Sequence, residues 1–242
     1  MRLSRLLAEG AVLPAPEHLE LDAAGSRDAL REWYRGEAAG VRIDLVQSLD
    51  GSAQGLDGTS ETLSSGADRA VLGAIRAESD VVLIGARSFR AEGPLLPRRA
   101  RLAVLTRSGE LGGAAIPPGG PASSAVVTVL APATAEARVR ATLEGVELDF
   151  APLPEAGAAG VDLGAALDAL RDRGLPRIVC EGGPSLAAAL IDAGRVDELC
   201  LSTAAAITGT GVPALGAPGP RGARLRQLAA DELGNLYTRW AL

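Results

Sequence analysis

An acidic side chain and a glycine-rich turn follow the short apolar run 177–180, and we expect chemistry at this junction. The run predicts a buried strand that ends at Glu181, and Gly182 and Gly183 permit a tight turn with close backbone approach. Pro184 is well placed as the first residue of a helix, whose unpaired amides attract anions. A plain strand-to-helix turn has the same pattern, so the functional interpretation depends on the carboxylate of Glu181.

A second feature that could take part in chemistry is a cluster of arginines between residues 87 and 107. The whole chain carries a net charge of -6 and a pI near 5.0, which argues against a nucleic-acid-binding surface. An anionic ligand would therefore need a local basic patch, although a solvated arginine-rich loop fits the same pattern. The arginines of this segment are Arg87, Arg90, Arg98, Arg99, Arg101 and Arg107.

The chain has no lysine, and its only histidine is His18, in a proline-rich segment. This excludes a Walker-type phosphate loop, a pyridoxal Schiff base and a Ser-His-Asp triad, each of which needs one of these residue types. No G-x-G-x-x-G motif follows a predicted strand, so a Rossmann dinucleotide site is unsupported. Two distant cysteines and one histidine give no zinc-ligand spacing, and we expect no bound metal.

Cys180 and Cys200 both lie in apolar runs, where cysteines are usually inert core residues. Unpaired cysteines also fit a reducing compartment. No segment approaches the length of a membrane span, and the N-terminal residues lack a convincing signal-peptide core. We therefore expect a cytoplasmic protein that binds neither membranes nor nucleic acid.

Strand-like and helix-like segments alternate along the chain, which predicts an α/β layer architecture. Residues before about 40 form an N-terminal arm with a helix-like segment, 27–35, which we expect to dock against the main body. The expected strands are residues 41–47, 80–84, 101–106, 125–130, 146–150, 176–180, 198–203 and 235–241. The expected helices are residues 66–78, 133–143, 163–173 and 184–193.

Four motifs occur in an order that is similar to a known family. They are Ser48-Leu49-Asp50-Gly51 followed by Gly58-Thr59-Ser60, the segment 72–85 with Arg76 and Gly85, the turn 181–186, and residues 196–199. Together they resemble the reductase domain of the riboflavin-biosynthesis protein RibD, from about residue 41 to the last residue. The N-terminal arm and the segment 236–240 are similar to stand-alone actinobacterial-type pyrimidine reductases.

The resemblance implies a dihydrofolate-reductase-like fold, a three-layer α/β/α arrangement with a mixed, mostly parallel central sheet. It divides the chain into an arm over residues 1–40 and a reductase domain over residues 41–242. It also implies a homodimer that uses NADPH and acts on a small heterocyclic substrate. Ligands of such folds lie at the carboxyl ends of strands, where we expect Gly85, Thr106 and Glu181.

The resemblance further implies which residues hold the cofactor. Thr106, Arg107 and Ser108 correspond to the segment that holds the adenosine phosphate, and two hydroxyls beside a planar cation suit a phosphate. A polar exit from a strand is the alternative for this segment. Ser88 and Glu92 stand near the nicotinamide, where the family usually has Thr and Asp. The implied cofactor-binding residues are Gly85, Ser88, Glu92, Thr106, Arg107, Ser108, Gly182, Gly183, Pro184, Ser185 and Leu186.

Substrate contacts are implied in the same way. Ser60 and Arg76 correspond to substrate-contacting positions, Arg99 lies near the place of an arginine that holds a ribose phosphate, and Glu181 would hydrogen-bond the substrate. The alternative for Ser60 is a turn or N-cap hydroxyl, and for Arg76 a helix-end cation. The implied substrate-binding residues are Ser48, Ser60, Arg76, Leu96, Arg99 and Glu181.

Asp44 departs from the family pattern, which places a lysine four residues before Ser48. If Asp44 faces the active site, its carboxyl should be paired or protonated, with a pKa raised by desolvation, as expected of a group that hydrogen-bonds or protonates a heterocycle. If it lies on the other face of the strand, it meets solvent instead. Residues 204–209 also replace a proline-containing segment, so the rim of the pocket should differ from that of the family.

The leading hypothesis is hydride transfer from NADPH to an electrophilic carbon of a pyrimidine-type substrate, such as the ribosylaminouracil phosphate of riboflavin biosynthesis. Asp50, Asp44 or ordered water could deliver the accompanying proton, and Glu181 completes the candidate catalytic residues. A reduced pterin such as dihydrofolate, contacted by Asp44, is the second hypothesis. A protein that binds NADPH without turnover is the third.

Overall fold

The computed structural model describes residues 1–92, 97, 99–112, 127–155 and 160–242. The strands are β1 (Arg2–Ala8), β2 (Ala11–Glu20), β3 (Gly40–Ser48), β4 (Val81–Gly85), β5 (Arg101–Leu105), β6 (Val127–Pro132), β7 (Leu148–Leu153), β8 (Arg177–Cys180), β9 (Glu198–Ala204), β10 (Arg224–Asp231) and β11 (Leu236–Ala241). The helices are α1 (Ser26–Trp33), α2 (Gly66–Ala77), α3 (Ala86–Glu92), α4 (Glu136–Thr142), α5 (Leu163–Arg171) and α6 (Pro184–Asp192).

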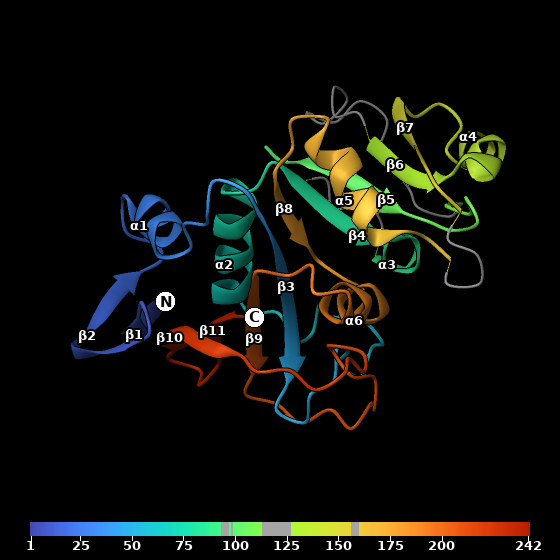
Figure 1. Ribbon diagram of the computed structural model, residues 1–242. Coiled ribbons are helices and arrows are strands. Elements are labelled where there is room, and N and C mark those ends of the chain that lie inside the picture. The colour runs from blue at the N-terminus through green and yellow to red at the C-terminus, as the bar shows by residue number, and fades with distance from the viewer. Residues whose placement is uncertain (93–96, 98, 113–126, 156–159) are drawn as a thin grey trace.

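The strands form a single sheet in the order β2-β1-β10-β11-β9-β3-β8-β4-β5-β6-β7 (Figure 1). The consecutive neighbours from β9 to β7 all pair in parallel. The pairs from β2 to β9 at the other edge are antiparallel. The parallel strands therefore all end on the same side of the sheet, where ligands of α/β proteins collect.

Two apolar cores lie on opposite faces of this sheet because successive strand residues point to opposite sides. On one face, Val82 of β4 and Val104 of β5 belong to the core that contains Ile75 of α2. On the other face, Leu83 of β4 belongs to the core that contains Leu167 of α5. Helices α2, α3 and α4 contribute to the first core, and α5 and α6 to the second. The expected three-layer α/β/α architecture with a mixed, mostly parallel sheet is confirmed.

The expected strands and helices of the main body are present, with ends that differ by a few residues. The prediction of a helix over residues 133–143 is wrong in part. Its first residues, Ala133–Ala135, form a 3-10 turn, and α4 begins only at Glu136. The expected strand 125–130 begins at Val127 in the structure, and its first two residues lie outside the described residues.

Three strands and one helix were not expected from the sequence. Strand β2 contains Pro14 and Pro16, which argue against a strand, but β2 is the edge of the sheet, where proline is tolerated. Polar residues interrupt the pattern of β10, and the short α3 follows β4 without an intervening turn. Pairing with neighbours, rather than local pattern, forms these strands.

A buried ion cluster ties the N-terminal helix to the sheet. Glu198 of β9 accepts hydrogen bonds from Arg239 of β11 at 2.8 and 3.0 Å and pairs with Arg42 of β3 at 2.8 Å. The same two guanidinium groups donate to the carbonyl oxygens of Tyr34 (2.7 Å) and Trp33 (2.5 Å) at the end of α1. Because β3 also carries Asp44, this cluster holds the strand that supplies one side of the site.

Candidate active site

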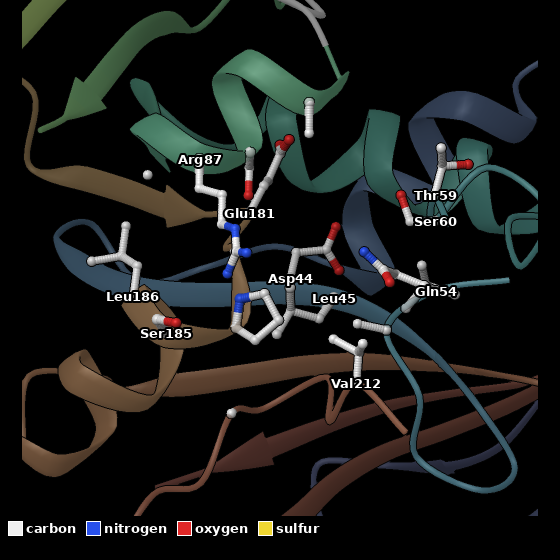
Figure 2. A pocket seen from close by; sticks show the side chains of 18 of the residues that line it. Asp44, Leu45, Gln54, Thr59, Ser60, Arg87, Glu181, Ser185, Leu186 and Val212 are labelled. Atoms are coloured by element: carbon white, nitrogen blue, oxygen red, sulfur yellow. The ribbon is translucent and has the colours of Figure 1, made fainter. Parts of the chain in front are cut away.

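A cavity of about 1130 Å³ opens beside the carboxyl ends of the parallel strands. Its walls come from β3, the loop after β3, α2, the start of α3, the end of β5 and the start of α6, with residues 212–216 at the rim (Figure 2). The volume exceeds the roughly 300–1,000 Å³ that is typical of a site for one small molecule. The cavity therefore has room for more than one small ligand.

The turn 181–186 forms one wall of this cavity. Gly85 donates its amide hydrogen to the carbonyl oxygen of Gly182 at 2.8 Å, which joins the turn to the end of β4. Gly182 has a φ of 91°, and a side chain on Gly183 would place its Cβ 2.7 Å from the Oγ atom of Ser88. Pro184 then begins α6, as expected. The chain thus needs small residues here so that the start of α6 can approach the β4–α3 junction.

The rim segment near Gly216 contacts the start of α6 just as closely. Gly216 has a φ of 66°, and its Cβ would lie 2.7 Å from the carbonyl oxygen of Pro184 and 2.9 Å from the Cβ of Ala188. We expect Gly216→Ala to lower the free energy of unfolding by about 1–3 kcal/mol, because backbone cannot move away as a flexible side chain can. Gly222→Ala is the matched control, since nothing lies within 4 Å of its Cβ. Urea unfolding measures both, and equal stability of the two variants would contradict this packing.

Arg76 and Glu181 form a bidentate ion pair inside the cavity. The guanidinium group of Arg76 donates to the two carboxylate oxygens of Glu181 at 2.6 and 2.5 Å. The pair links the last turn of α2 to the end of β8, and both side chains are largely buried. The sequence implied two separate substrate contacts at these positions. The structure brings them together, and the arginine fixes the orientation of the Glu181 carboxylate.

Asp44 faces the cavity and not solvent, which decides between the two orientations that the sequence left open. Its side chain lines the cavity, and Figure 2 shows it pointing toward Gln54 from the loop after β3. Burial raises the pKa of Asp44 well above its ordinary value, and the nearby carboxyl groups of Asp68 and Glu181 add to this effect. Asp44 therefore lies where a bound ring would meet a carboxyl group that resists ionisation.

Asp68 is a second buried acid in the cavity, and no motif in the sequence points to it. It lies in the first turn of α2, where its amide donates to the N-cap Oγ of Ser65 at 3.0 Å. An acid in that position is usual at a helix start. Burial raises the pKa of Asp68, and hydrogen bonds with Ser202 and Ser64 oppose that rise. Only the packing of α2 against β3 shows that this side chain belongs to the cavity.

Asp50 does not lie in the cavity, where a catalytic acid would be expected. It is not among the described residues that line the cavity, and its carboxylate accepts hydrogen bonds from the amides of Thr208 (3.2 Å) and Gly209 (2.8 Å) and from the buried hydroxyl of Ser48. These hydrogen bonds lower the pKa of Asp50 to about 2. Asp50 is therefore ionised near neutral pH, and with Ser48 it holds the turn after β3.

The low pKa of Asp50 predicts a pH dependence of stability. The pKa in an unfolded chain is about 4, so the bonds to Asp50 stabilise the folded state above about pH 4 and are lost as the pH falls toward 2. We expect Asp50→Asn to lose less stability between pH 4 and pH 2 than the unaltered protein. Asp172→Asn, at an exposed acid after α5, is the control. Parallel stability curves for all three proteins in thermal unfolding would refute the prediction.

The three residues expected to hold the adenosine phosphate, Thr106, Arg107 and Ser108, do not all lie at the cavity. Arg107 lines the cavity beside Leu105. The Oγ1 atom of Thr106 accepts from the amide of Gly109 at 3.1 Å, and the Oγ atom of Ser108 accepts from the amide of Glu110 at 3.3 Å. The two hydroxyls therefore hold the turn after β5, and among these three residues Arg107 is the one that reaches the cavity.

All the predicted site residues fall into three groups. The structure brings to the cavity Ser60, Arg76, Gly85, Ser88, Arg107, Glu181, Gly183, Pro184, Ser185 and Leu186, together with Asp44. Among the described residues, the cavity lining does not include Ser48, Asp50, Arg99, Thr106, Ser108 or Gly182. Leu96 lies outside the described residues, as does the side chain of Glu92.

Sequence reasoning missed several residues of the cavity. Figure 2 shows Arg87 reaching from the start of α3 into the cavity, opposite Thr59 and Gln54 from the loop after β3. Arg87 belonged to the arginine-rich segment, and recognising α3 would have separated it from the other arginines. Thr59 belongs to the Gly58-Thr59-Ser60 motif but was not predicted as a site residue, and no local pattern marks Gln54 itself.

The described part of the chain has neither a cluster of potential metal ligands nor a helix that could span a membrane. No group of three or more His, Cys, Asp or Glu side chains there could hold a metal ion. No helix within the same residues has the length and apolar character needed to cross a membrane.

The fold and the site together define the class of the protein. A mixed α/β sheet presents a glycine-lined helix start, arginines and buried acids to a cavity at the carboxyl ends of its parallel strands, which is the arrangement of an α/β protein that binds small molecules. Residues 39–238 match the family model of the RibD C-terminal domain. The chain belongs to this family, and the resemblance seen in the sequence is confirmed.

Solved structures of other proteins share this fold. A pyrimidine reductase-like protein of Corynebacterium diphtheriae is 25% identical with a TM-score of 0.67, over 84% of this chain and 91% of that one. The riboflavin biosynthesis reductase Rib7 of Saccharomyces cerevisiae is 14% identical with a TM-score of 0.64, over 86% of this chain and 92% of that one.

A longer protein shares the fold over part of its length. The deaminase/reductase of Thermotoga maritima named for diaminohydroxyphosphoribosylaminopyrimidine is 17% identical with a TM-score of 0.65. The match covers 84% of this chain and 56% of that protein, so this chain spans little more than half of it. None of the curated protein sequences is similar enough to this chain to count as a relative.

Proposed function

We propose that this protein is an NADPH-dependent reductase of a pyrimidine-type substrate, such as the ribosylaminopyrimidine phosphate of riboflavin biosynthesis. The observation that carries the proposal is one cavity that contains both a cradle for a phosphate-bearing cofactor and a set of polar groups for a heterocycle. Membership of the RibD C-terminal domain family supports it, as do the names of the similar solved structures. A homodimer remains our expectation for the assembly.

The cofactor side of the cavity is the wall around the start of α6. Gly85 and Gly183 line this wall without side chains, and the first amides of α6 suit a pyrophosphate. Arg107 supplies a planar cation for a further phosphate. These residues fit a phosphorylated dinucleotide, which when bound would supply a hydride.

The substrate side of the cavity is the wall formed by β3, the loop after it and α2. Ser60, Gln54 and Asp44 offer hydrogen-bonding groups there, and the carboxylate of Glu181 is held in one orientation by Arg76. Fixed groups of this kind position a heterocycle against the cofactor wall. Positioning of two reactants can lower the barrier by about 7–11 kcal/mol.

One observation favours a second candidate substrate, a reduced pterin such as dihydrofolate. Asp44 places a carboxyl group in the cavity where the family pattern has a lysine, so a phosphate-bearing substrate would not meet a cation at this position. A pterin ring offers hydrogen-bond donors to such a group. The two substrates therefore belong in the same experiment.

The proposal is tested by titrating the purified protein with NADPH and NADH and then adding each substrate while nicotinamide absorbance is followed. We expect tight binding of NADPH and its oxidation on addition of the ribosylaminopyrimidine phosphate. Oxidation with dihydrofolate alone would support the second candidate. Binding of NADPH without oxidation by either substrate would contradict both and leave a cofactor-binding protein, and no binding of either nucleotide would overturn the proposal.

Arg107 provides a sharper test of the cofactor side. We expect Arg107→Ala to weaken NADPH binding by about 10-fold to 100-fold, the effect of losing a hydrogen bond to a charged group. Arg101→Ala is the matched control, because Arg101 is an exposed arginine at the start of β5 and does not line the described part of the cavity. Isothermal calorimetry compares the two, and an equal effect of both would show that Arg107 does not contact the nucleotide.

A further inference from the structure

Two buried aspartates from different elements line the cavity on the substrate side. Asp44 belongs to β3 and Asp68 to α2, and their exposed fractions are 9% and 8%. Both line the cavity, and the charge of Asp68 disfavours ionisation of Asp44. Two carboxyl groups in such surroundings do not both ionise readily, because burial and mutual repulsion favour the neutral form.

Arg76 and Arg42, whose charges lower the pKa of Asp44, are each bound by another acid. Arg76 is bound by both oxygens of Glu181, and Arg42 pairs with Glu198 of the neighbouring strand β9. Neither guanidinium group is therefore dedicated to Asp44. The charged and titratable groups that act on Asp44 electrostatically are Asp68 and Arg76 of α2, Glu181 after β8, Arg42 of β3, Tyr34 after α1 and Cys200 of β9, and Arg87 of α3 lines the same cavity.

We propose that Asp44 and Asp68 form a carboxyl pair that keeps one proton at neutral pH, and that Asp44 delivers this proton to the substrate nitrogen during reduction. In this pair Asp44 is the catalytic residue and Asp68 is a positioning residue, which acts through Asp44. The delivery step rests on the proposed function. The existence of the pair does not, because it concerns the free protein.

The step balances for either candidate substrate, since an opened ribosylamino group and a dihydropterin both offer a carbon–nitrogen double bond. A hydride from NADPH forms a new C–H bond at the carbon, and the π electron pair moves to the nitrogen. The O–H bond of Asp44 breaks as an N–H bond forms, which leaves a carboxylate on Asp44. Water in the open cavity returns a proton to Asp44 before the next turnover.

The side chain of Asp68 is held in place for this role. Its carboxylate hydrogen-bonds with Ser202 of β9 and Ser64 before α2, which lowers its pKa, and its own amide donates to the N-cap Oγ of Ser65. These bonds stabilise the ionised form of Asp68, so its charge favours retention of the proton by Asp44. Removing the charge at this position should therefore allow Asp44 to ionise at lower pH.

The pair is tested on the free protein by nuclear magnetic resonance with ¹³C-labelled aspartate carboxyls, in which Asp44→Asn identifies the Asp44 signal. We expect Asp44 to titrate well above the ordinary aspartate range, and Asp68→Asn to lower its midpoint by about one pH unit or more. Asp68→Glu should retain the high midpoint, and Asp172→Asn should leave it unchanged. An ordinary midpoint for Asp44 in the unaltered protein, or the same midpoint in Asp68→Asn, would overturn the pair.

The delivery step is tested by the pH profile of kcat/KM, which reports groups of the free enzyme. We expect kcat/KM to fall as the pH rises above the titration midpoint of Asp44. In Asp68→Asn this fall should move to lower pH by as much as the Asp44 midpoint itself moves. A profile that does not follow the Asp44 midpoint would overturn Asp44 as the donor. Absence of turnover with both substrates would contradict the proposed function and proton delivery, whereas the carboxyl titration would still decide whether the pair exists.

Discussion

Replacing Glu198 by Gln should lower the free energy of unfolding by about 3–5 kcal/mol, the range seen when one partner of a buried ion pair is removed. Glu198 is 6% exposed, and it is the carboxylate that neutralises Arg42 and Arg239. The variant would leave two buried guanidinium groups without a counter-charge. The end of α1 should also loosen, because the same groups bind its last carbonyl oxygens.

Glu78→Gln is the matched control for this change. Glu78 follows α2, where it pairs with the more exposed Arg31 at 2.8 Å, so its loss leaves one cation that water can reach. We expect a cost of about 0–1 kcal/mol for it. Chemical unfolding of both variants provides the comparison. An effect of Glu198→Gln no larger than that of Glu78→Gln would show that the cluster does not stabilise the fold.

The second large effect is expected at Asp44. Asp44→Asn keeps the size of the side chain but removes the carboxyl proton, so the rate of hydride transfer should fall by about 100-fold to 10,000-fold. NADPH affinity should stay the same, because the groups expected to hold the cofactor, Arg107 and the first amides of α6, belong to other elements than Asp44. Single-turnover kinetics with the enzyme–NADPH complex measures this rate apart from binding.

Asp50→Asn is the matched comparison, since Asp50 is the other aspartate that the sequence offers as a proton donor. Its carboxylate is held by the amides of Thr208 and Gly209 and is ionised near neutral pH. We therefore expect a much smaller loss of rate than in Asp44→Asn. The reverse order of effects would make Asp50 the donor and would contradict a role for Asp44 in proton delivery.

The central sheet could be predicted from the sequence because its strands are buried on both faces. Runs such as residues 81–85 of β4 and 102–105 of β5 are continuously apolar, which is typical of strands that are buried on both faces. The outer strands β1, β2 and β10 carry charged residues or proline, so only their pairing shows that they are strands. Their formation depends on neighbours that are distant in the chain, such as Leu3 opposite Asp231.

The candidate site could be predicted only where local motifs mark it. The turn from Glu181 to Leu186 has such a motif, and the structure brings it to the cavity. The pairing of Arg76 with Glu181 joins residues that are 105 positions apart, which no local pattern contains. Similarly, the alternation of side chains along β3 shows which residues share a face of the sheet with Asp44. It does not show which of the two faces α2 covers.

The central claim is that this protein transfers a hydride from NADPH to a carbon of a pyrimidine-type substrate. The most direct measurement is mass spectrometry of the product after turnover with NADPH deuterated at either C4 position of the nicotinamide. We predict a reduced product that contains one deuterium with one of the two labelled forms. Reduced product without deuterium from either form, or no product at all, would contradict the claim.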